Sequence, residues 1–83
     1  MDEALIEETR RWLGEEGLAF FSKLLEDHGK VDPVLIVGRQ IPHPVHWREG
    51  MQVRNFLRQH VDWDQEELDN RWTEVVEKCI RRK

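Results

Sequence analysis

The stretch that decides the fold is WDQEELDNRWTEVVEKCI, residues 63–80, which has the pattern of an amphipathic helix. Asp64 and Glu67 stand in the spacing of a capping box, and Trp63 precedes them where an apolar side chain packs against Leu68 across the first turn. The following apolar residues recur at the helical period: Leu68, Trp72, Val75, Val76, Cys79 and Ile80. The pattern predicts a helix that starts at the Asp64 cap, ends in the cations at the C-terminus and buries one face in a core.

Residues 2–28 carry another apolar stripe, but two glycines interrupt it. Gly14 and Gly17 each cost up to about 1 kcal/mol inside a helix. Gly29 stands where a helix commonly ends in a left-handed residue. We therefore predict two helices, 2–13 and 16–28, with a single kinked helix as the alternative.

A further helix is predicted over 47–59, after a non-helical stretch over 30–46. The segment VLIVG, 34–38, reads as extended, and prolines 42 and 44 hold the next residues away from helical angles. We identify no second strand, and one strand cannot satisfy its own backbone. The segment is therefore expected to be an irregular connector or to pair with its own copy across a two-fold axis.

These elements predict an all-α fold, a small bundle of three to four short helices with a Pro-rich extended connector that includes at most one short strand. The chain, 1–83, is expected to form a single helical domain, because 83 residues are close to the minimum for one core. The expected core is formed by Leu13, Phe20, Phe21, Leu24, Phe56, Leu57, Trp72, Val76 and Cys79.

The net charge of −4 is distributed unevenly along the chain. Residues 1–28 contain eight acids and three bases, whereas residues 29–63 contain three acids and five bases. This asymmetry favours pairing of the two segments within one chain or between copies. A single cysteine and the lack of a long apolar run predict a cytoplasmic protein without a membrane span.

The sharpest chemical motif is H-x-x-H, formed by His43 and His46 in the stretch QIPHPVHWREG. A metal site would need Glu49 or His60 as a further ligand, because zinc takes three or four. A proline between the histidines favours a stiff corner instead. We therefore predict no bound metal and no cofactor, and keep metal binding through His43 and His46 as a second alternative.

The sequence contains few residues that could act as a catalytic nucleophile. The chain has one serine, Ser22, within a predicted helix, and no tyrosine. Cys79 lies on the core stripe, where a free cysteine is usually a small buried apolar residue. No glycine-rich phosphate loop follows a strand. We therefore expect a protein that is not an enzyme.

The residues fit a protein-interaction domain best. Four tryptophans are many large rings for this length, and tryptophan and arginine are enriched at interfaces. We predict a self-associating domain, a homodimer or a complex with another protein, and an acidic partner for a surface within 39–58. Its residues would be Arg39, His43, His46, Trp47, Arg48 and Arg54. The alternative is nucleic-acid binding through the arginines at 39–58, against which the negative net charge argues.

Overall fold

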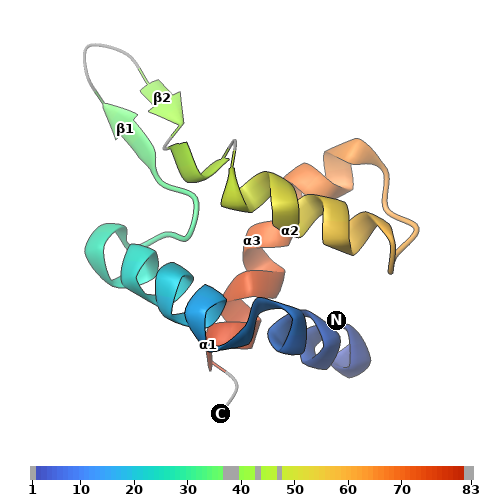
Figure 1. Ribbon diagram of the computed structural model, residues 1–83. Coiled ribbons are helices and arrows are strands. Elements are labelled where there is room, and N and C mark those ends of the chain that lie inside the picture. Colours follow the sequence, from blue (N-terminus) through green and yellow to red (C-terminus); the bar gives the residue numbers. More distant parts are fainter. Residues whose placement is uncertain (1, 37–39, 43, 47, 82–83) are drawn as a thin grey trace.

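The computed structural model describes residues 2–36, 40–42, 44–46 and 48–81. Helix α1 (Glu3–His28) is followed by strands β1 (Val34–Ile36) and β2 (Gln40–Pro42). A 3-10 turn, η1 (Pro44–His46), then leads into α2 (Glu49–Arg58) and α3 (Gln65–Arg81). Both α1 and α2 pack against α3, so the predicted small helical bundle is confirmed with three α-helices (Figure 1).

Helix α1 is one element that bends at Gly14, which is the alternative to the two helices predicted over 2–13 and 16–28. Gly14 has φ 69° and ψ −177°, a backbone conformation that only glycine adopts readily, and the helix changes direction there (Figure 1). Gly17 stays helical. The ends of α1 are also the predicted ones, because Asp2 Oδ1 accepts the amide of Ala4 at 3.0 Å and Gly29 caps the C-terminus with φ 75°.

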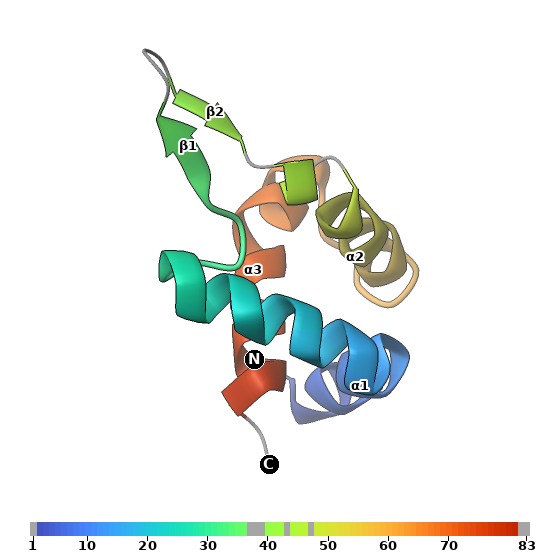
Figure 2. The same cartoon turned by 60° about the vertical axis from the view of Figure 1, so that its left-hand side comes forward.

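The prediction of at most one strand is wrong, because two segments of the connector pair with each other. Strands β1 and β2 form an antiparallel hairpin in the register Val34↔Pro42, Leu35↔Ile41 and Ile36↔Gln40. The hairpin projects away from the helices in both views (Figures 1 and 2). The strand that pairs with one edge of β1 is therefore in the same chain.

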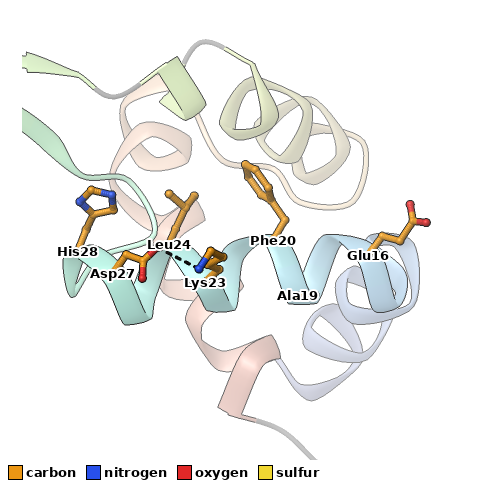
Figure 3. Close-up of a pocket in the computed structure, with 7 residues that line it drawn as sticks. All are labelled: Glu16, Ala19, Phe20, Lys23, Leu24, Asp27 and His28. Atoms are coloured by element: carbon orange, nitrogen blue, oxygen red, sulfur yellow. Dashed lines mark ion pairs between the residues drawn. The ribbon is translucent and has the colours of Figure 1, made fainter.

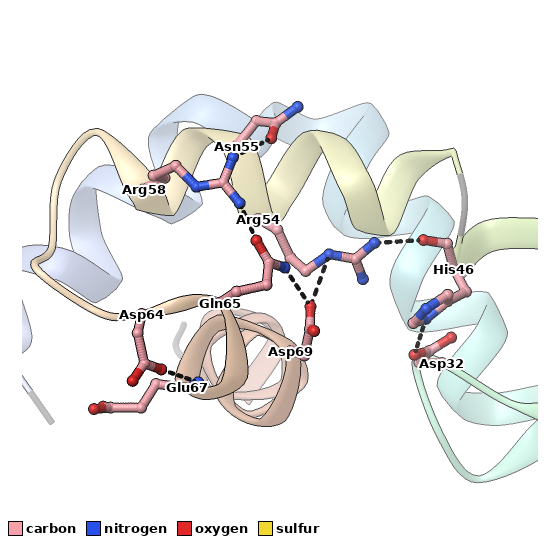
Figure 4. Close-up of polar contacts among 9 residues, drawn as sticks. All are labelled: Asp32, His46, Arg54, Asn55, Arg58, Asp64, Gln65, Glu67 and Asp69. Carbon is pink, nitrogen blue, oxygen red and sulfur yellow. Dashed lines mark hydrogen bonds and ion pairs between the residues drawn. The ribbon is translucent and has the colours of Figure 1, made fainter.

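Helix α2 starts later than predicted. The chain turns through η1 before Glu49, and the N-cap residue Arg48 makes no side-chain cap. Pro44 suits the first position of such a turn because its φ is already fixed. Helix α3 starts as predicted, because Asp64 Oδ1 accepts the amide of Glu67 at 2.8 Å (Figure 4).

The core lies where α3 meets α1, α2 and η1. Its buried residues come from all of these elements and from the loop before β1: Leu5, Ile6, Phe21, Leu24, Val31, Val45, Val53, Leu57, Leu68, Trp72, Val75, Val76 and Cys79. Three residues of the expected core need correction. Phe20 is 39% exposed, whereas its neighbour Phe21 is buried against the edge of Trp72. Leu13 and Phe56 are only partly buried.

Candidate interaction surface

Three of the six residues predicted to bind a partner lie within the described residues. His46, Arg48 and Arg54 are described, whereas Arg39, His43 and Trp47 lie outside the described ranges. The three described residues do not form one exposed patch. His46 is half-buried, Arg48 is exposed and Arg54 is buried.

His46 holds the corner between the α1–β1 loop and α2. Its Nδ1 atom lies 2.8 Å from Oδ2 of Asp32, and its carbonyl oxygen accepts a hydrogen bond from Nη2 of Arg54 at 2.9 Å (Figure 4). Both side chains of the His46–Asp32 pair are largely shielded from solvent. These contacts give His46 a role in joining local elements.

Arg54 lies inside the fold, which corrects its interpretation as an exposed anchor. Its side chain is 7% exposed, and its Nε atom lies 3.6 Å from Oδ1 of Asp69. The guanidinium also lies over the ring of Trp72, 5.6 Å from the ring centre. The α2 positions that carry Gly50, Val53 and Leu57 are buried too, so the helical period places Arg54 at the edge of this core face.

The outer face of α2 is basic. Arg48, Met51, Asn55 and Arg58 recur along one side of the helix, and all four are exposed. Arg58 donates hydrogen bonds to the side chains of Asn55 and Gln65 (Figure 4). Arg48 donates to Glu49 at 3.3 Å. Sequence analysis singled out Arg48 but not Met51.

A groove lies along the second half of α1. It has a volume of about 600 Å³, and all the residues that line it come from α1: Glu16, Ala19, Phe20, Lys23, Leu24, Asp27 and His28. Phe20 and Leu24 rise from α1 on the side that faces α2, with Glu16 and His28 at opposite ends (Figure 3). Lys23 pairs with Asp27 at 3.5 Å. We call this feature the α1 groove.

The first half of α1 meets α2 through stacked rings. Trp12 stacks on Phe56 with ring centres 4.6 Å apart, and Phe56 lies 4.3 Å from the ring of His60. His60 in turn lies 3.2 Å from the carboxylate of Glu8. Trp12 remains 43% exposed, whereas Trp72 is buried.

The described residues contain no cluster that could hold a metal ion, and their one thiol is buried. No three His, Cys, Asp or Glu side chains are grouped there as ligands, and His43 lies outside those ranges. Cys79 is buried, with Sγ 3.5 Å from the carbonyl oxygen of Ile6. No described helix combines the length and the apolar character that a membrane span requires.

No family model matches this sequence, and neither a curated protein nor a solved structure is similar to the chain. The α1 groove and the basic face of α2 are therefore the features on which a functional argument can rest.

Proposed function

We propose that the protein is a small protein-binding domain whose α1 groove accepts an amphipathic helix with an apolar anchor and basic flanks. The observation that carries the proposal is the α1 groove itself. Leu24 is a buried apolar residue of the groove. The aromatic side chain of Phe20 lies beside it and is 39% exposed.

The apolar part of the groove has the character of a binding site. Exposed aromatic rings next to a concave apolar surface are typical of anchor positions, because a partner side chain removes both from water at once. Trp12 adds a further exposed ring on the same helix. A groove of about 600 Å³ has room for a few partner side chains.

The charges around the groove favour a partner with positive charge. Residues 1–28 contain eight acids against three bases, and Glu16 and Asp27 flank the groove. Lys23 is the one lysine along its wall, and it is already paired with Asp27. Complementary charge raises the association rate and excludes acidic competitors, so a basic helix fits this surface best.

The alternative of nucleic-acid binding loses support from the placement of the arginines. Arg54 is buried and contacts Asp69, so it is not available to a phosphate. Among the described arginines within 39–58, Arg48 and Arg58 are exposed, and Arg48 contacts Glu49. Two exposed cations beside an acid supply few of the phosphate contacts that drive such binding.

The test uses a synthetic helical peptide with leucines at i, i+3 and i+7 and lysines on both flanks. Titration into isotope-labelled protein should shift the NMR amide signals of Phe20 and Leu24. The matched peptide with glutamates in place of the lysines should bind at least about tenfold more weakly, because it meets the acidic flanks of the groove.

The variant Phe20→Glu should lose peptide binding and keep its fold, since Phe20 is at the surface. Its matched control is Glu66→Gln on α3, an exposed position far along the chain from the groove. Equal binding of both peptides, or signal shifts that avoid Phe20 and Leu24, would contradict the proposal.

A further inference from the structure

The exposed face of α2 has the features that the α1 groove demands of a partner. Met51, Asn55 and Arg58 recur at helical spacing along α2, and Arg48, the N-cap residue, stands three positions before Met51. Met51 is 42% exposed and is the apolar member of the row. We call this set the α2 row. It offers one flexible apolar side chain between two cations.

We infer that the occupant of the α1 groove is the α2 row of a second copy of the chain. This inference rests on the proposed protein-binding role of the groove and names its partner. Strand β1 already has a backbone partner in β2 of the same chain, and the exposed faces of α1 and α2 carry complementary charges, so these helical faces are the surfaces that we assign to self-association.

The distance between the two arginines of the α2 row matches the distance between the two acids of the α1 groove. At about 1.5 Å per residue, Arg48 and Arg58 lie about 15 Å apart along α2, and Glu16 and Asp27 lie about 16 Å apart along α1. If Met51 is set opposite Phe20, Arg48 comes opposite the end of the groove marked by Glu16. Arg58 then comes opposite Asp27. A parallel alignment of the two helices therefore pairs both cations with acids around one apolar contact.

The charges of the two faces are available for such pairing. Arg58 contacts the neutral side chains of Asn55 and Gln65, so no acid among its described partners neutralises it. Arg48 contacts Glu49, and Lys23 contacts Asp27, but both pairs lie at the surface. Exposed pairs of this kind contribute little and exchange partners readily.

Two-fold symmetry would double the contact. Each copy carries one α1 groove and one α2 row, so an isologous dimer places the row of each copy in the groove of the other. Every charge reversal in one copy is then felt twice in the dimer. This property gives a direct experiment.

The experiment uses two double variants of the full chain. The α1 variant carries Glu16→Arg and Asp27→Arg, and the α2 variant carries Arg48→Glu and Arg58→Glu. Sedimentation velocity across the micromolar range should show a dimer for the unmodified chain. Each double variant alone should dissociate at least about tenfold more readily, because acids would meet acids or bases would meet bases.

An equimolar mixture of the two variants should restore the dimer, since both contacts in the mixed pair join opposite charges. The matched control carries Glu66→Arg and Glu74→Arg on the exposed face of α3 and should dimerise like the unmodified chain. Met51→Asp provides a single exposed change that should weaken the dimer without disturbing the helices, as circular dichroism would show.

A monomeric unmodified chain, or a mixture that fails to restore the dimer while both variants keep their helical signal, would overturn the inference. The basic peptide separates this result from failure of the proposed function. Peptide binding at Phe20 and Leu24 of the α2 variant, whose groove is intact, would leave the proposed function standing with another protein as partner. Absence of that binding would remove both.

Discussion

Gly50 of α2 lies against the indole of Trp72 in α3. A methyl group at position 50 would stand 2.9 Å from both Cη2 and Cζ2 of the ring and 3.0 Å from the carbonyl oxygen of Val45. Trp72 is fully buried, so its ring has no room to move away. The contact explains how α2, η1 and α3 come together closely enough to enclose the largest side chain of the core.

Gly50→Ala should therefore destabilise the fold although alanine is the better helix former. Overpacking of a filled core costs about 1–3 kcal/mol, which exceeds the gain of about 1 kcal/mol in helix propensity. Urea unfolding monitored by tryptophan fluorescence measures the difference. Gln52→Ala, at an exposed position of the same helix, is the matched control and should change the free energy of unfolding little. An unchanged or higher stability of Gly50→Ala would contradict the packing described.

Arg54 is expected to matter for stability more than the exposed arginines. Arg54→Ala removes the hydrogen bond to His46 and the contact with Trp72, and it leaves a hole at the edge of the core. The free energy of unfolding should fall by about 1–3 kcal/mol. Denaturant unfolding of Arg54→Ala beside Arg48→Ala, whose side chain is exposed, tests this order.

Arg54→Met adds a distinction to that test. In the unmodified chain the Nη1 atom of Arg54 is buried and has no hydrogen-bond partner among the described groups, so burial of this donor carries a cost. Methionine keeps much of the volume and removes that donor. It should therefore destabilise less than alanine does. Equal losses for both variants would show that the polar contacts, and not the packing, dominate.

Gly14→Ala should destabilise the fold through backbone strain and not through a clash with a neighbouring side chain. No atom lies within 4 Å of the position that a methyl group would take, but φ of 69° with ψ of −177° is strained for any residue with a Cβ. The expected cost is about 1–3 kcal/mol, measured by thermal or urea unfolding. Glu15→Ala, exposed at the next position, is the control.

Gly14→Ala should also change the fluorescence of the folded protein. If alanine straightens α1 at residue 14, the stacking of Trp12 on Phe56 is lost, and tryptophan fluorescence in the folded state should change. A Gly14→Ala protein with unaltered stability would show that the bend of α1 does not depend on the freedom of glycine.

Local chemistry accounts for what could be predicted about the helices. Asp64, Gly14 and Gly29 act through their own backbone or through amides a few residues away, so their effect is visible in a short stretch of sequence. The apolar period of residues 68–80 likewise predicted the buried face of α3, and five of its six stripe residues are buried.

Prediction was less successful wherever the outcome depends on segments far apart in the chain. The partner of β1 could not be recognised because β2 is only three residues long and ends in a proline. Phe20 and Phe21 are adjacent and chemically identical, so the angle at which α1 meets α3 decides which ring is buried. The predicted binding residues were chosen by type, and residue type does not distinguish a buried arginine from an exposed one.

The sequence by itself therefore determined where α1 begins, bends and ends and where α3 begins, because caps and glycines act over a few residues. Only the tertiary structure decided that Arg54 is internal, that Phe20 is external and that Met51 and Arg58 are exposed on α2. Burial and surface complementarity are properties of packed elements, and they arise only when distant parts of the chain meet.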